Sequence, residues 1–135
     1  MRVFIDTNIL ISCIIWPDRK PAQAFFKAAY GDGNKAIVCE YSIDELHRVF
    51  RKKFSGLMHD MISFLAIHMP ALEVVPVTSE PCESEQLIRD ENDRPILRAA
   101  INARADILLT GDKDFLDSGI PHPRIMNASE FLELD

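Results

Sequence analysis

The chain has 135 residues, of which 47% are hydrophobic and 27% are charged, and its 15 basic and 21 acidic residues give a formal net charge of −6. This composition excludes an intrinsically disordered chain, and the length is that of one globular domain, expected here over residues 1–135. The acidic balance argues against a protein that coats nucleic acid or an anionic membrane through diffuse positive charge.

The first half of the chain is predicted to contain two strands and four helices. Val3-Phe4-Ile5 is a short β-branched and aromatic run that stops at Asp6, which is typical of a buried strand. The next apolar run is expected to form a helix that Thr7 or Asn8 caps and that Pro17 ends. The predicted segments are strand 3–5, helix 9–16, helix 21–30, strand 36–39, helix 42–54 with Ser42 as its cap, and helix 57–68.

The second half continues the alternation of strands and helices. A polar stretch at 78–92 is expected to be a loop with a short helical turn, and Pro95 falls in the first turn of the helix that follows it. Alternating strands and helices predict a three-layer α/β/α fold with a mostly parallel central sheet. The predicted segments are strand 72–77, helix 94–104, strand 107–109, helix 112–116, strand 124–126 and helix 128–134.

The cysteines and the apolar runs indicate the compartment. Cys13, Cys39 and Cys82 are scattered without a CxxC spacing, so they predict neither a disulfide framework nor a zinc site. Such cysteines fit a reducing compartment, and a cytoplasmic protein is expected. The longest apolar run, at 9–16, is far shorter than the roughly 20 residues that a membrane span needs, so no membrane association is expected.

Acidic residues recur where the predicted strands end or the helices begin. Asp6 follows the first strand, Glu45 lies early in the helix after the second strand, Asp93 precedes the helix at 94–104, and Asp112 and Asp114 follow the fourth strand. Parallel sheets gather functional residues at the carboxyl ends of their strands. Crowded carboxylates recruit a cation, and their oxygens favour Mg²⁺ or Mn²⁺ over zinc. Such ions can promote phosphodiester cleavage.

Most of these carboxylates also have a structural interpretation, which the sequence leaves open. Asp6, Asp93 and Asp112 each stand where a helix N-cap is expected, and Asp90 competes with Asp93 for that role. Asp114 suits the positive end of the dipole of the short helix at 112–116. Because each signal is weak alone, their joint placement on successive strand ends is what favours a functional site.

Segments spread over the whole chain resemble the PIN domain family. Val-Phe-Ile-Asp-Thr-Asn-Ile-Leu at 3–10 is similar to the family's opening, and Leu-Thr-Gly-Asp-Lys-Asp-Phe at 109–115 closely resembles its "TGDxDF" stretch. Asp-Glu-Leu at 44–46 falls where the family carries an acidic residue on a helix, and Asp-Glu-Asn-Asp at 90–93 resembles its third acidic segment. The end of the chain, at 125–132, is similar to its last strand and helix.

The resemblance implies a PIN-like fold and a metal-dependent endoribonuclease that uses Mg²⁺ or Mn²⁺. Many small single-domain relatives of this kind are toxins of toxin–antitoxin pairs, such as VapC; they are usually homodimers and are inhibited by a small antitoxin protein. Arg94 stands where relatives often carry Asn. By position, the implied catalytic metal ligands are Asp6, Glu45, Asp93 and Asp112, with Asp114 as an auxiliary acid and Thr7, Asn8 and Thr110 as polar supports.

The predicted helix at 42–54 carries both an implied ligand and basic side chains. Ser42 and Glu45 match the capping box S-x-x-E, so Glu45 also has a purely structural interpretation. Arg48 and Lys52 follow at helical spacing, and we expect them to contact the phosphates of an RNA substrate. The alternative is a solvated face on which Asp44 and Arg48 form an ordinary i,i+4 pair.

Two other functions remain open at this point. The chain is alternatively a catalytically inactive PIN-like module that binds RNA or protein, although an unused carboxylate cluster would destabilise the fold through repulsion. An aspartyl-phosphate phosphatase or phosphoacceptor with Asp6 as nucleophile is disfavoured, because no second acidic residue stands close to Asp6 in sequence. Setting aside five pocket carboxylates leaves 16 acidic residues against 15 basic ones, so the net charge does not exclude RNA.

Overall fold

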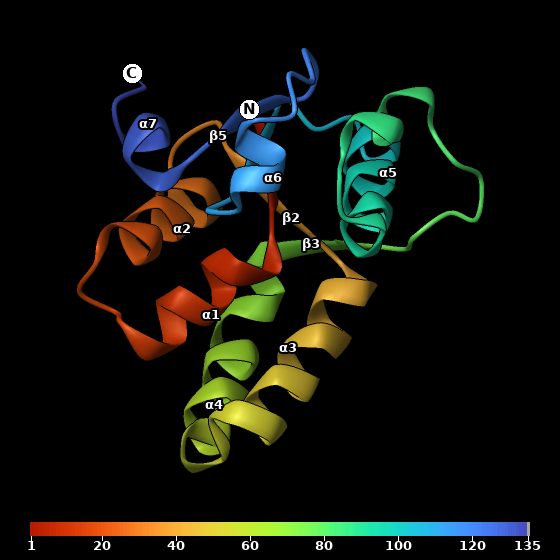
Figure 1. Ribbon diagram of the computed structural model, residues 1–135. Coiled ribbons are helices and arrows are strands. Elements are labelled where there is room, and N and C mark those ends of the chain that lie inside the picture. Colours follow the sequence, from red (N-terminus) through yellow and green to blue (C-terminus); the bar gives the residue numbers. More distant parts are fainter. Residues whose placement is uncertain (135) are drawn as a thin grey trace.

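A five-stranded parallel sheet forms the centre of the molecule in the computed structural model, which describes residues 1–134 (Figure 1). The strand order is β3-β2-β1-β4-β5, and every neighbouring pair is parallel. The carboxyl ends of all five strands therefore meet at one edge of the sheet. The strands are β1 (Arg2–Ile5), β2 (Lys35–Cys39), β3 (Leu72–Val75), β4 (Ile107–Leu109) and β5 (Arg124–Met126).

Helices cover both faces of this sheet and complete the predicted three-layer α/β/α fold. On one face the core contains buried side chains of α1 (Thr7–Ile15), α2 (Lys20–Tyr30), α3 (Glu40–Lys53), α4 (Met58–His68) and α7 (Ala128–Leu132). On the other face it contains side chains of α5 (Arg94–Asn102) and α6 (Lys113–Leu116). Figure 1 shows α5 on the opposite side of the sheet from α2 and α7. No helix within residues 1–134 is long and apolar enough to cross a bilayer.

The central strand β1 is apolar at its last three positions rather than alternating. Val3 and Ile5 point into one core and Phe4 points into the other, and all three are completely buried. A parallel strand with helices on both faces has no solvent-facing side, so each of its positions is apolar. In register, Ile5 of β1 lies opposite Leu109 of β4, which places the residues after these two strands side by side.

Several predicted boundaries are wrong: the helices expected to end at residues 104 and 134 end at Asn102 and Leu132, and three more differ at the ends of β2, β1 and β3. The helix expected to begin after Ser42 begins at Glu40, because β2 leads directly into it through an extended Cys39, and Ser42 is buried inside the first turn. The first helix begins at Thr7 with Asp6 as its N-cap, where Thr7 or Asn8 was expected to be the cap. The strand expected to reach residue 77 ends at Val75, since the following Pro76 has no N–H to donate to a ladder.

A nearly buried ion pair fastens the segment between β3 and α5. The Glu85 carboxylate accepts hydrogen bonds from Arg98 at 2.6 and 2.8 Å, and from the backbone N–H of Cys82 at 3.0 Å. Hydrogen bonding by Arg98 is the main reason that the pKa of Glu85 is lowered to about 2. Glu85 lies in the short 3₁₀ turn Glu83–Leu87, so the pair holds this segment onto α5.

We predict that Arg98→Ala lowers Tm by about 5 °C or more, because it leaves the Glu85 carboxylate in place without its partner. The stabilisation from Glu85 is present above its ordinary pKa of 4.5 and is lost as pH falls toward 2, since the folded state binds fewer protons than the unfolded chain in that range. Thermal unfolding followed by circular dichroism at pH 7 and pH 3 measures both effects.

The matched control is Arg89→Ala, which removes the exposed partner of another ion pair, with Asp114. Its side chain is 87% exposed, so we expect little change in Tm. Equal changes in the two variants, or a loss in Arg98→Ala that is no smaller at pH 3 than at pH 7, would contradict the role assigned to Glu85 and Arg98.

Candidate active site

Asp6 is held at the carboxyl end of β1 by three hydrogen bonds. Its Oδ1 accepts from the backbone N–H of Thr7 at 2.8 Å, and its Oδ2 accepts from the Thr110 hydroxyl at 2.7 Å and from Asn8 Nδ2 at 3.2 Å. The bonds come from α1 on one side and from the end of β4 on the other, and the residue is only 6% exposed. This carboxylate is therefore fixed in position before any ligand arrives.

The environment of Asp6 disfavours its negative charge in spite of those bonds. Burial raises the pKa of Asp6 to about 6, and this effect outweighs the hydrogen bonds from Thr110 and Thr7, which act in the opposite direction. The negative charges of Glu45 and Asp112 raise the pKa further. A buried carboxylate with acidic neighbours favours either a proton or a bound cation.

The residues after β4 form the second part of the site and are bonded to the first. Thr110 Oγ1 accepts from the backbone N–H of Asp112 at 3.0 Å, and the N–H of Gly111 donates to Asn8 Oδ1 at 3.0 Å. Asp112 Oδ1 in turn accepts from the N–H of Asp114 at 2.9 Å, at the start of α6. Asn8 and Thr110, which were predicted as polar supports, thus join the ends of β1 and β4.

Glu45 and Asp93 reach the same edge of the sheet from helices. Glu45 lies in the second turn of α3, and its charge acts on Asp6. Asp93 ends the 3₁₀ turn Glu91–Asp93 before α5; burial raises its pKa first, followed by the charge of Asp112 and a hydrogen bond with it. The charges of Glu45 and Asp112 act on Asp6, and those of Asp112 and Asp6 act on Asp93, so the four carboxylates lie near one another, and their role as metal ligands stays a prediction.

A helix-capping role explains some of these carboxylates and not others. Asp6 and Asp112 do accept capping hydrogen bonds from their helices. Glu45 does not close a capping box, since α3 begins before Ser42, and the side chain of Asp93 makes no capping bond. Asp90 caps its own 3₁₀ turn by accepting from the N–H of Asn92 at 3.0 Å. Capping therefore accounts for neither Glu45 nor Asp93.

Asp114 and Asp90 extend the acidic cluster toward α6. Oxygen atoms of Asp90, Asp93 and Asp114 all lie within 4.8 Å of one another. Asp114 also pairs with Arg89, whose Nη2 lies 2.8 Å from Asp114 Oδ1. The sequence left open whether Asp90 joins the site, and it gave no indication of Arg89. The acidic run at 90–93 was the available signal for Asp90, whereas the pairing of residues 89 and 114 depends on the fold.

The donor atoms of this cluster fit a hard divalent cation. They are carboxylate oxygens, supplemented by the hydroxyl of Thr7, which is buried beside Asp6 and has no hydrogen-bond partner within residues 1–134. Oxygen donors of this kind suit Mg²⁺ or Mn²⁺. A cation would also relieve the repulsion that raises the pKa of Asp6 and Asp93.

Basic side chains follow Glu45 along α3. Arg48, Arg51 and Lys52 line a hollow of about 320 Å³. The alternative pair between Asp44 and Arg48 is not formed: no carboxylate of the described chain lies within 4.0 Å of the Arg48 guanidinium as an ion pair. The guanidinium instead lies over the ring of Tyr41, 5.7 Å from its centroid.

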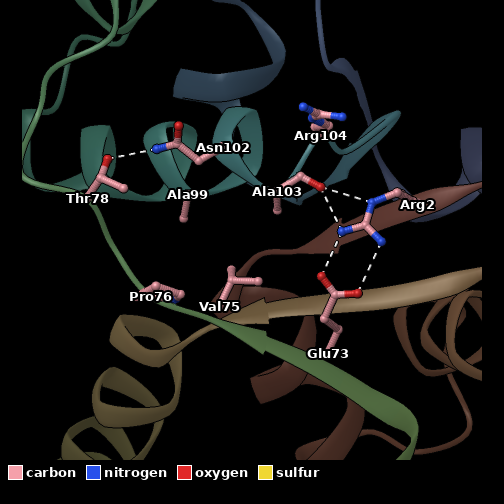
Figure 2. A pocket seen from close by; sticks show the side chains of 9 residues that line it. All are labelled: Arg2, Glu73, Val75, Pro76, Thr78, Ala99, Asn102, Ala103 and Arg104. Carbon is pink, nitrogen blue, oxygen red and sulfur yellow. Dashed lines mark hydrogen bonds and ion pairs between the residues drawn. The ribbon is translucent and has the colours of Figure 1, made fainter.

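A separate cavity of about 400 Å³ lies between β3 and α5, toward the amino ends of the strands. Figure 2 shows the Arg2 guanidinium between the Glu73 carboxylate and the carbonyl oxygen of Ala103, with bonds of 2.7 to 3.1 Å. Asn102 donates to the Thr78 hydroxyl at 2.7 Å in the same cavity. Because its one carboxylate is paired with arginine, this cavity offers no cation site.

Comparison with known proteins gives a family model and similar folds. Residues 2–114 match the family model described as PIN domain. The chain is 27% identical over 146 residues to the uncharacterized protein MJ1680 of Methanocaldococcus jannaschii, over 98% of this chain and 90% of that one.

Two solved structures share the fold. One is a chain of VapBC2 from Rickettsia felis, which was crystallised bound to a DNA fragment from its promoter. The TM-score is 0.69 with 20% identity, over 94% of this chain and 98% of that one. The other is PAE2754 from Pyrobaculum aerophilum, with a TM-score of 0.59 and 13% identity, over 98% of this chain and 93% of that one. At these identities the likeness establishes the fold alone.

We predict that the stability of the metal-free protein falls as pH rises from about 4 to about 7. The native state keeps protons on Asp6 and Asp93 at pH values where the unfolded chain has released them. The free energy of unfolding therefore falls as pH rises. Tm measured in EDTA across this range is expected to decline less steeply in Asp6→Asn, which removes one of the two groups.

Burial lowers the pKa of His68, so His68 makes stability rise with pH, opposite to the two aspartates. Because Asp6→Asn leaves His68 unchanged, the difference between the variant and the unmodified protein isolates the effect of Asp6. Asp32→Asn, on an exposed turn, is the matched control and is expected to follow the unmodified protein. An identical pH dependence of Tm in Asp6→Asn and the unmodified protein would show that Asp6 is ionised normally.

Proposed function

The chain belongs to the PIN domain family, and on that premise we propose that residues 1–135 act as one metal-dependent endoribonuclease domain. PIN domains are generally nucleases, so the family supports phosphodiester hydrolysis as the type of reaction. The observation that carries the proposal is the grouping of Asp6, Glu45, Asp93 and Asp112 at one edge of the sheet, where burial and, after it, neighbouring negative charges raise the pKa of Asp6 and Asp93.

In this proposal Asp6, Glu45, Asp93 and Asp112 hold one or two Mg²⁺ or Mn²⁺ ions, and Asp114 is an auxiliary acid. A bound ion would supply Lewis-acid chemistry, which activates water and stabilises charge on the phosphate. The chain itself supplies the orientation. Hydrogen bonds from Thr110 and Thr7 fix the two oxygens of Asp6, so that no reorganisation is needed when the ion arrives.

The same carboxylates control how readily the ion binds. Asp6 and Asp93 retain protons at a higher pH than ordinary aspartates, and a metal ligand must be deprotonated. Ion uptake is therefore coupled to the loss of protons from these carboxyl groups and strengthens with pH up to about 7. Above that pH the carboxylates are ionised, and their mutual repulsion is relieved only by a cation.

The substrate is RNA, which Arg48 and Lys52 contact through its phosphates. Support comes from the position of these side chains around the hollow on α3 and from the absence of an ion pair at Arg48 within the described chain. A local group of basic side chains is what an acidic protein needs to bind a polyanion. Binding is then concentrated beside the carboxylates rather than spread over the surface.

We further propose that this ribonuclease is the toxin of a type II toxin–antitoxin pair, acts in the cytoplasm and is inhibited by a small antitoxin protein. The similarity to a chain of VapBC2 over 94% of the present chain supports this, as do three free cysteines, which suit a reducing compartment. A homodimer is supported by the exposed apolar side chains of α2 and α4, namely Phe26, Tyr30, Ile62 and Ile67.

We predict that Asp6→Asn and Asp93→Asn each slow the cleavage of a fluorescently labelled single-stranded RNA in Mn²⁺ by at least about 100-fold. Millimolar Mn²⁺ is expected to raise the Tm of the unmodified protein, and to raise that of Asp6→Asn much less, because only a ligand that binds the folded state stabilises it. Asp32→Asn is the control and is expected to cleave normally.

Normal cleavage by Asp6→Asn would refute the assignment of Asp6. If the unmodified protein neither cleaves RNA nor gains stability from Mn²⁺, the chain is an inactive module that binds RNA or protein.

We also predict that Arg48→Ala and Lys52→Ala each reduce the slope of log Kd against log salt concentration by about 0.7, the value for one phosphate contact on a single strand. Binding is measured by fluorescence anisotropy in Ca²⁺ over a range of salt concentrations. Arg124→Ala, at the amino end of β5, is the control and is expected to leave the slope unchanged. Unchanged slopes in both α3 variants would place the phosphate contacts elsewhere.

A further inference from the structure

Tyr41 lies where α3 leaves the sheet, about one helical turn before Glu45 and two turns before Arg48. It is the second residue of α3 and follows directly from the end of β2. Its ring packs, partly buried, against the core on the α5 side, whereas Leu46 and Phe50 of the same helix pack into the core on the other face. Packing therefore fixes the ring at the carboxyl edge of the sheet.

Charged groups of both signs surround the Tyr41 phenol. The charges that act on it are those of Glu45 and Arg48 from later turns of α3 and of Asp93 from the turn before α5. Burial, followed by the charge of Glu45, raises the pKa of Tyr41, so the phenol is neutral at physiological pH. The phenol is thus a neutral group near both the carboxylates of the site and the first basic side chain of α3.

Arg48 is held by this ring rather than by a carboxylate. Asp44 and Glu45 precede it by four and three residues, at spacings that normally favour an ion pair on a helix. The guanidinium lies instead over the Tyr41 ring, with Cζ 5.7 Å from the centroid. A cation–π contact holds the guanidinium in place without neutralising it, and leaves N–H groups in its plane available to an anion.

We propose that Tyr41 is a positioning residue for the substrate: its ring holds the Arg48 guanidinium ready to bind an RNA phosphate next to the one at the carboxylates. This inference rests on the proposed ribonuclease function and adds the residue that keeps Arg48 available. Without the ring, Arg48 is free to pair with Asp44 or Glu45. Either pair would neutralise the charge that the substrate needs, and a pair with Glu45 would also occupy a proposed metal ligand.

The test is a double-mutant cycle between Tyr41 and Arg48. The probe is a 5′-fluorescein-labelled single-stranded RNA, and its binding is measured by anisotropy in Ca²⁺ at several salt concentrations. We expect Tyr41→Leu to weaken binding about 3- to 5-fold, as the loss of a cation–π contact implies, and to flatten the salt dependence as Arg48→Gln does. In the Arg48→Gln background the same change at Tyr41 is expected to have no further effect.

Tyr41→Phe is the conservative variant, because it keeps the ring and loses only the hydroxyl. We expect it to bind RNA within 2-fold of the unmodified protein. Circular dichroism and Tm verify that each variant is folded, and Tyr41→Met, which has no ring but a similar length, replaces Tyr41→Leu if the latter does not fold. In cleavage assays the loss is expected in KM, with a smaller change in kcat.

Three results would overturn the inference: normal binding by the variant without a ring, an equal loss in the presence and absence of Arg48, or a loss in Tyr41→Phe as large as in Tyr41→Leu. The second would mean that Tyr41 contacts RNA itself, and the third that its hydroxyl is the determinant. Coupled binding without any cleavage would count against the proposed function alone. Cleavage without coupling between Tyr41 and Arg48 would count against this inference alone, and failure of the unmodified protein to bind RNA would contradict both.

Discussion

The hydrogen bond from the Thr110 hydroxyl to Asp6 joins the carboxyl ends of the two central strands, and the rest of the site is arranged around it. The backbone supports the same junction, since the N–H of Asp6 donates to the carbonyl oxygen of Leu109 at 3.0 Å. Residues more than a hundred positions apart meet here because neighbouring parallel strands present their ends at one edge. Glu45 and Asp93 then arrive from helices whose buried side chains pack on opposite faces of the sheet, so every layer of the fold contributes to the cluster.

This junction brings negative charges together around the buried Asp6, whereas Glu45, Asp93 and Asp112 are partly exposed. Three hydrogen bonds to Asp6 would by themselves favour its ionised form, and yet burial and the neighbouring charges prevail and raise its pKa to about 6. Asp93 has no such opposing hydrogen bonds, since burial, the charge of Asp112 and a hydrogen bond with Asp112 all raise its pKa. Crowded carboxylates that destabilise the free protein are expected where a protein binds a ligand. The bound ligand then interacts with them and stabilises the folded state.

The sequence predicted the architecture better than it predicted the beginnings of helices. Alternating apolar strands and amphipathic helices were sufficient for a parallel three-layer fold, because burial on both faces leaves a plain signature in residues such as Val3-Phe4-Ile5. The capping box at Ser42 was misleading, since β2 runs straight into α3 and no side chain caps it. Local propensity was overridden there by the path of the chain. The pairing of Arg89 with Asp114 was beyond prediction, because it depends on how two segments pack rather than on spacing.

Helix α3 illustrates why spacing alone does not decide the chemistry of a surface. Asp44, Glu45 and Arg48 have the spacings of ordinary helix ion pairs, and sequence reasoning left such a pair open. The outcome depends on Tyr41, whose ring is fixed by the core on the α5 side and offers Arg48 a surface that is neither charged nor freely hydrated. Because the guanidinium lies over the ring and pairs with no carboxylate of the described residues, one helix can present a carboxylate to a cation and a guanidinium to a phosphate. A net charge of −6 is compatible with RNA binding on these terms, since what matters is the separation of charges near the strand ends.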